Sequence, residues 1–141
     1  MRRLSRITLT LVVLLALTTV VAVGCGGDEE GLDGTSWRLQ GWSVSSLSPG
    51  DFEITAAFTS DQISGRAAIN TYSGSYTVTP DGEFAVGELA RTLMAGSEED
   101  MRAEDTYFQL LGEATAYQVD DGQLILSDAN GNQLLIYDPQ D

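Results

Sequence analysis

Carboxylates are the only side chains in this chain that are numerous enough to suggest acid–base chemistry. The 141 residues include 21 Asp and Glu, 7 Arg, and neither Lys nor His. Without histidine there is no imidazole base, and the usual zinc, copper and haem ligands are missing. Two facing carboxylates could still hydrolyse a glycoside, but spacing along the chain does not identify such a pair. We therefore expect no enzyme activity, no metal and no cofactor, with a carboxylate-based hydrolase as the less favoured alternative.

Two polar segments have spacings that could suggest ligand sites. Asp128, Asn130 and Asn132 alternate as in a calcium loop, but the glycine is misplaced and Pro139 stands where the bidentate Glu would be. A type I′-like hairpin explains that segment better. The acidic run at 98–105 is better explained as the solvated start of a helix than as a metal site. No glycine-rich loop leads into a helix with a lysine, so a nucleotide phosphate has no obvious cradle.

Cys25 is the only cysteine, and it closes the run AVGC at residues 22–25. An uncharged stretch at 7–24 precedes it and follows three arginines, which is the order of a signal peptide. The AVGC ending resembles the bacterial lipobox. We expect a lipoprotein signal peptide over 1–24, lipid attachment at Cys25, and a flexible acidic tether over 25–31.

Two other interpretations of the amino terminus are weaker. An uncleaved membrane helix would need nearly all of the 18 uncharged residues, which is the lower limit for a span. Arg2 and Arg3 come too early for a twin-arginine signal. Whether this segment is cleaved before Cys25 or stays in place as a membrane helix, the domain is expected outside the cytoplasm, in the cell envelope and anchored to the membrane. Each buried methylene adds about 0.8 kcal/mol of membrane affinity, so two or three acyl chains would hold it firmly.

The charge of the mature chain limits its partners. All 21 acidic residues follow Cys25 and only four arginines do, giving a formal charge of 4 − 21 = −17. Such a surface repels phosphates, so nucleic acid is not an expected partner. A single cysteine also allows no internal disulfide. We expect a monomeric domain whose partner is an envelope protein, a glycan or a small ligand.

The hydrophobic pattern predicts one mainly β domain over residues 32–139. It is expected to be a small antiparallel β-barrel-like domain of seven to eight short strands with one α-helix. Glycine at a change of phase predicts a bulge near Gly41. The expected strands lie at 36–44, 54–59, 63–69, 72–78, 84–89 (running on towards Met94), 117–119, 124–126 and 134–137.

The single helix is expected at about 98–111. Ser97 is a suitable N-cap, with Asp100 three residues later, and Gly112 is a plausible stop. The apolar stripe expected to face the core contains Met101, Phe108 and Leu111, with Tyr107 and Leu110 beside it.

A set of residues spread through the middle of the domain resembles the META domain, also called HslJ-like. The resemblance extends over 32–139. The residues that carry it are Gly65, Asn70, Tyr72, Gly74, Tyr76, Arg91, Thr92 and Met94. It implies a compact β-rich domain, often found on bacterial envelope lipoproteins and in proteins linked to stress, with no established enzyme activity. Relatives often carry cysteines where this chain has Ile69 and Gly96, which excludes a thiol-based role here.

The motif residues have two interpretations. Tyr72, Tyr76 and Asn70 could form a small-ligand site with Arg66 and Arg91, or they could serve the core and a bend. The leading hypothesis is a non-enzymatic envelope lipoprotein that supports envelope integrity or stress tolerance by binding. A secreted inhibitor or ligand-binding module is the alternative. A deep apolar pocket lined by both tyrosines would favour a ligand, whereas a filled barrel with exposed aromatic loops would favour a protein.

Overall fold

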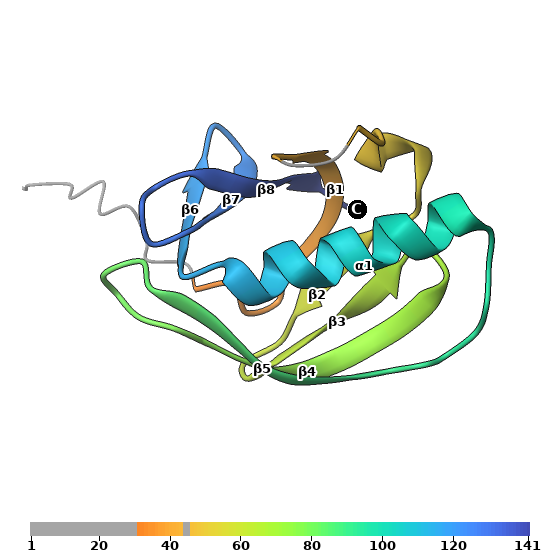
Figure 1. The fold of residues 1–141 in the computed structure, drawn as a ribbon. Coiled ribbons are helices and arrows are strands. Elements are labelled where there is room, and N and C mark those ends of the chain that lie inside the picture. The colour runs from red at the N-terminus through yellow and green to blue at the C-terminus, as the bar shows by residue number, and fades with distance from the viewer. Residues whose placement is uncertain (1–30, 44–45) are drawn as a thin grey trace, which may run out of the picture.

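An eight-stranded antiparallel sheet curls around one α-helix in the computed structural model (Figure 1). The structure describes residues 31–43 and 46–141, so the expected signal peptide, Cys25 and most of the tether lie outside the described residues. The expected mainly β fold is confirmed. The elements are β1 (Ser36–Trp42), a 3-10 turn η1 (Pro49–Asp51), β2 (Thr55–Phe58), β3 (Gln62–Ala67), β4 (Asn70–Val78), β5 (Phe84–Arg91), α1 (Glu98–Glu113), β6 (Ala116–Asp120), β7 (Gln123–Ser127) and β8 (Gln133–Pro139).

The strands form two meanders joined by one long-range pairing. Their order in the sheet is β5-β4-β3-β2-β1-β8-β7-β6, so of the strands in the described part of the chain β1 and β8 are the only neighbours in the sheet that are distant in sequence. Trp37 faces Pro139 in that pairing, and the Gln140 N–H donates to the Ser36 carbonyl at 2.9 Å. The beginning and the end of the domain therefore meet.

The sheet closes only at one point, which makes it a half-barrel. Within the described residues, β5 and β6 meet at an isolated bridge between Glu83 and Ala116. The Phe84 N–H donates to the Thr115 carbonyl, and the Tyr117 N–H donates to the Gly82 carbonyl, both at 2.9 Å. Beyond this bridge the edge strands β5 and β6 diverge. The helix α1 lies in the concave side of the sheet, with β1 and β8 on one side of it and β3, β4 and β5 on the other (Figure 1).

Alternate side chains of the strands fill the space under α1, as the period of two predicted. Trp37 and Leu39 on β1 are buried, as is the run of Ile54, Ala56 and Phe58. The Phe58 and Tyr76 rings meet edge to face with centroids 4.9 Å apart. The expected bulge is also present, because the register of β1 against β8 shifts between Leu39 and Gly41.

Three predicted strand ends are wrong. The first strand was expected over 36–44, but β1 ends at Trp42. The third strand was expected to reach Ile69, but β3 ends at Ala67 because Ala68 has a left-handed backbone (φ 61°) and begins a tight turn. Alanine rarely takes that conformation, so a turn at Ala68 is not predicted from residue type. The fifth strand was expected to run towards Met94, but β5 ends at Arg91.

The helix begins as predicted and ends later. Ser97 Oγ accepts from the Asp100 N–H at 3.1 Å and donates to the Asp100 carboxylate at 2.8 Å. Gly112 does not stop α1, which continues to Glu113 and ends where Ala114 turns extended towards β6. Met101 was wrongly placed on the core stripe. The buried residues of α1 centre on Tyr107, and at about 100° per residue Met101 lies about 120° around the helix from Tyr107, on an exposed flank. The buried residues of α1 are Ala103, Glu104, Tyr107, Leu110 and Leu111.

The last two hairpins use different turns. Asp121 and Gly122 both have positive φ between β6 and β7, as a type I′ turn requires. The 128–132 loop is longer than the predicted I′-like turn: the Asp128 carboxylate accepts backbone N–H bonds from Asn130 and Asn132 at 2.9 Å. Hydrogen bonds from the Asn132 side chain and the loop amides lower the pKa of Asp128. Hydrogen bonds within the loop thus explain why Asp128, Asn130 and Asn132 alternate as they would in a calcium loop.

Candidate functional site

Three tyrosine hydroxyls form a buried chain between α1 and the sheet. Tyr137 Oη donates to Tyr107 Oη at 3.1 Å, and the hydroxyls of Tyr107 and Tyr72 lie 2.7 Å apart. Tyr72 Oη also donates to the Thr55 carbonyl at 2.7 Å. Burial raises the pKa of Tyr107 to about 12. The three hydrogen-bonded tyrosines come from β4, α1 and β8, so their hydroxyls hold the helix in the half-barrel.

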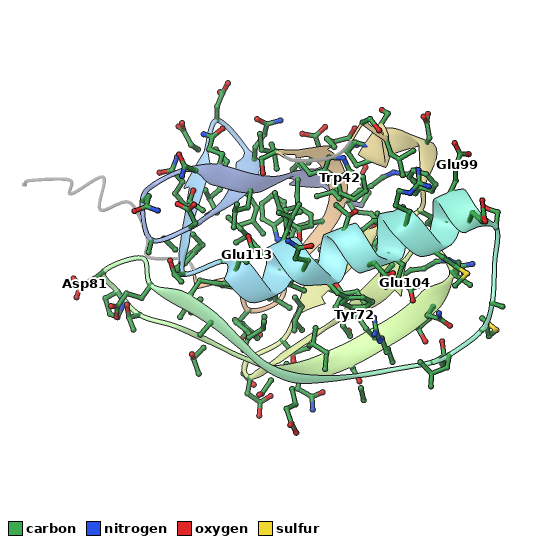
Figure 2. All side chains as sticks on the ribbon, viewed as in Figure 1. Trp42, Tyr72, Asp81, Glu99, Glu104 and Glu113 are labelled. Carbon is green, nitrogen blue, oxygen red and sulfur yellow. The ribbon has the colours of Figure 1, made fainter. Side chains whose placement is uncertain are left out.

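The second motif tyrosine is also part of the core. Tyr76 is buried against Phe58 and Phe84, and its hydroxyl donates to the Thr59 carbonyl at 2.6 Å. Figure 2 shows Tyr72 lying between α1 and the strands below it. Side chains therefore fill the half-barrel at both tyrosines, and their hydroxyls bond to the protein itself.

Asn70 joins three segments of the chain at the start of β4. Its Oδ1 accepts from Thr92 Oγ1 at 2.7 Å and from the Met94 N–H at 2.8 Å. Its Nδ2 donates to the Met94 carbonyl at 3.2 Å and to Glu104 Oε1 at 2.9 Å. This side chain captures the segment after β5, which explains why that strand does not continue to Met94.

Glu104 is the buried carboxylate of the domain's interior, with only 7% of its surface exposed. It extends from α1 towards the sheet (Figure 2) and accepts from both the backbone N–H and the side chain of Asn70, at 2.9 Å each. Helical spacing places Glu104 on the same stripe as Tyr107 and Leu111, three and seven residues later. Sequence reasoning still passed it over, because a Glu in an acidic run normally faces solvent. Asn70 and Glu104 together fix the first half of α1 on the β3–β4 turn.

The motif glycines stand where the backbone comes too close for a side chain. A Cβ on Gly65 would lie 2.1 Å from the Thr55 carbonyl oxygen, and a Cβ on Gly74 would lie 2.5 Å from the Glu88 carbonyl oxygen. Gly74 lies where β4 and β5 shift register. Both glycines therefore permit bends of the sheet.

The two arginines considered for a ligand site have partners within the domain. Arg66 forms an exposed ion pair with Glu53 at 3.5 Å. Arg91 places its guanidinium carbon 4.7 Å from the centre of the Phe108 ring. A bound anion is not needed to explain either residue. Between residues 31 and 141, leaving out 44–45, no three His, Cys, Asp or Glu side chains are grouped to hold a metal ion.

Exposed apolar side chains gather beside the Asn70 and Glu104 pair. Leu93 is 86% exposed, Met94 60% and Met101 47%. All three line one cavity of about 270 Å³, together with Asn70 and Glu104. We call Leu93, Met94 and Met101 the loop–helix surface, because the first two lie in the loop before α1 and the third in its first turns. Sequence reasoning missed it by assigning Met94 to a strand and Met101 to the core.

The loop–helix surface lies at the end of the domain opposite to Gly31. Asn70 begins β4 beside Met94, and Val78 ends it. Gly31 and Val78 line the same small cavity at the other end. At about 3.3 Å per residue, β4 separates the two ends by roughly 26 Å. The first described residue and the exposed apolar patch are thus at opposite ends.

The fold and the motif-built contacts define a small antiparallel half-barrel that holds one helix in its concave face. The META domain pattern matches residues 30–141, and the chain belongs to the META domain family. None of the curated proteins is a match for it. Among the described residues, no helix combines the length and apolarity needed to cross a membrane.

Solved structures share the fold. The NMR structure of a protein from Burkholderia xenovorans is 27% identical, with a TM-score of 0.63, and the match covers 77% of this chain and 83% of that one. A second NMR structure is 23% identical over 76% of this chain and 90% of the other, with a TM-score of 0.58. The crystal structure of a DUF4847 family protein from Bacteroides vulgatus is 13% identical, with a TM-score of 0.57, over 80% of this chain and 99% of that one. These last two likenesses concern the fold alone.

Proposed function

We propose that this protein is a lipid-anchored, non-enzymatic domain of the cell envelope that acts by binding another protein. The observation that carries the proposal is the loop–helix surface: Leu93, Met94 and Met101 are exposed together at one end of a domain whose interior is filled. Exposed apolar side chains that adjoin one another are typical of interaction sites. Exposed aromatic loops would have favoured a protein partner; the side chains exposed here are leucine and methionine, which make the same kind of apolar contact.

The filled half-barrel argues against a small ligand bound deep inside. Tyr72 and Tyr76, the residues considered for such a pocket, are buried and hydrogen-bonded to the protein. A ligand there would have to displace the packing that holds α1. Binding at the surface requires no such rearrangement, so a protein partner is favoured over an internal ligand.

The position of the loop–helix surface suits an anchored protein. Lipid on Cys25 would leave six residues to Gly31, which span at most about 22 Å. Gly31 lies at the end of the domain opposite to Leu93. The anchor would therefore attach at the end far from Leu93, which leaves Leu93 accessible to other envelope proteins. Support of envelope integrity or stress tolerance would follow from that contact.

Site-specific photocrosslinking in living cells tests the proposal. The full chain carries a photoreactive amino acid at Leu93, or at the exposed Val119 on β6 as the control position. A discrete crosslinked protein is expected from position 93 and not from position 119. Equal crosslinking at both positions, or none at 93, would contradict the proposal. Turnover of a substrate by the purified chain would contradict its non-enzymatic part.

A further inference from the structure

We infer that the loop–helix surface binds a cationic amphipathic segment of its partner, with a lysine or arginine of that segment entering the cavity beside Glu104. This inference rests on the proposed function and specifies the chemistry of the partner. The three exposed apolar side chains would contact the apolar face of the segment. The acidic residues of α1 around them would bind its positive charges.

The apolar part of the surface suits a helical or irregular segment. Two of its three members are methionines, whose flexible, polarizable side chains adapt to different shapes. An amphipathic helix binds by placing its apolar face in such a surface. Val119, the other large apolar side chain exposed among the described residues, lies on β6 and lines no cavity with these three.

The charge around the surface selects the sign of the partner. Residues 91–105 contain five acidic residues and two arginines, a formal charge of 2 − 5 = −3. Arg91 itself lines the cavity, but its guanidinium already lies over the Phe108 ring, and the acidic Glu104 and Asp105 line the same cavity. The whole mature chain carries −17, with no lysine to offset it. An acidic segment, an anionic lipid or a second copy of this chain would therefore meet repulsion, whereas a cationic segment would be attracted.

The cavity offers a place for one positive group. Each oxygen of the buried Glu104 carboxylate accepts one hydrogen bond from Asn70, and a carboxylate can accept about four. Asp105 lines the same cavity. Among the described residues the one ion pair is that of Arg66 with Glu53, so Glu104 has no cationic partner within the domain. An incoming ammonium or guanidinium group would supply it.

The size of the cavity favours a side chain over a whole small molecule. Its volume of about 270 Å³ is below the range of roughly 300–1,000 Å³ typical of small-molecule pockets. Leu93, Met94 and Met101 at its rim would contact the aliphatic stem of a lysine or arginine, as such stems pack on apolar surface. The cavity and its rim therefore match one long cationic side chain with apolar neighbours.

Binding of three synthetic peptides to the full chain tests the inference. The chain is held in nanodiscs of zwitterionic lipid, with empty nanodiscs as the blank, and affinity is measured by fluorescence anisotropy. The peptides are about 14 residues long, which gives four helical turns. One combines leucine and lysine at helical spacing, the second replaces lysine by glutamate, and the third replaces leucine by serine. The leucine–lysine peptide is expected to bind at least about tenfold more tightly than the other two.

Substitutions of exposed residues locate the binding without disturbing the core. The M94Q/M101Q double variant is expected to weaken binding of the leucine–lysine peptide about fivefold to tenfold, and V119Q is the matched control that should bind normally. D105N should weaken it severalfold at low salt, whereas D120N on β6 should not. Glu104 is left unchanged, because it also holds Asn70 in place.

Each outcome decides a different claim. If the serine–lysine peptide binds as tightly as the leucine–lysine peptide, or if M94Q/M101Q binds normally, the interaction is general attraction to an acidic protein and the inference is wrong. If the leucine–glutamate peptide binds as tightly as the leucine–lysine peptide, the inferred requirement for positive charge is wrong. A partner crosslinked at Leu93 together with failure of all three peptides would uphold the proposed function and overturn only the cationic segment.

Discussion

Ile69 and Gly96 lie against each other, although they are 27 positions apart in the chain. A Cβ on Gly96 would be 2.5 Å from Cδ1 of Ile69 and 2.8 Å from its Cγ1. The resemblance placed cysteines of relatives at these two positions. In this chain the Ile69 side chain occupies the space over the glycine, so packing joins the β3–β4 turn to the loop before α1.

The I69C/G96C double variant is expected to form a disulfide. A carbon–carbon bond of about 1.5 Å puts the two Cβ positions within about 2.8 + 1.5 = 4.3 Å, inside the range of disulfides. Closing a loop of this length should add about 3 kcal/mol to the free energy of unfolding. Free-thiol assay and urea unfolding with and without reductant measure both effects. The single variants I69C and G96C are the controls, and a double variant that stays reduced would refute the adjacency.

The N70A variant should lose about 3 kcal/mol of stability. Its side chain makes four hydrogen bonds. Its removal leaves the Met94 backbone N–H and carbonyl unpaired, and leaves the buried Glu104 with only the bond from the backbone N–H of residue 70. Urea unfolding followed by circular dichroism measures the change. N130A, in the exposed 128–132 loop, should change stability by less than about 0.5 kcal/mol. Equal stabilities of the two variants would show that Asn70 does not hold these segments together.

Stability should fall at alkaline pH because of the tyrosine chain. Burial raises the pKa of Tyr107 to about 12 and holds the pKa values of Tyr72 and Tyr137 well above their usual range. An unfolded tyrosine has a pKa of about 10, so the folded state binds more protons above that pH. The stabilisation is complete below pH 10. As the pH rises from 10 towards 12, each of these three buried tyrosines lowers the free energy of unfolding by about 1.4 kcal/mol per pH unit.

Urea unfolding between pH 8 and 11.5 measures this slope. The Y107F variant should lose about 1–2 kcal/mol at pH 8, because the Tyr137 hydroxyl loses its acceptor, and its stability should then fall less steeply with pH. Absorbance at 295 nm reports the ionisation directly. Titration of all five tyrosines near pH 10 in the folded protein would contradict the burial of these three hydroxyls.

The G65A variant should be destabilised by about 2 kcal/mol or more. The new Cβ would lie 2.1 Å from the Thr55 carbonyl oxygen, so β2 and β3 would have to move apart. G50A is the matched control, because a Cβ on Gly50 has nothing within 4 Å. Thermal unfolding compares the two. A G65A protein as stable as G50A would mean that the sheet accommodates a side chain at this bend.

Local patterns predicted most of the fold, and tertiary contacts explain what they missed. Alternation of apolar residues located the strands, and Ser97 marked the start of α1, because both signals act within a few residues. The turn at Ala68 and the burial of Glu104 depend on Asn70 and on segments distant in sequence. Met101 fits a stripe drawn through Phe108 and Leu111, but the contacts with the sheet turn Tyr107 and Leu110 inward, which leaves Met101 on the exposed flank of α1.

The hydrogen bond from Gln140 to Ser36 gives the domain a practical property. Because the chain enters and leaves at neighbouring points of adjacent strands, a linker of a few residues would join those points without strain. The half-barrel could then be grafted into an exposed loop of an unrelated host protein, or reopened between β5 and α1, with every pair of strands retained.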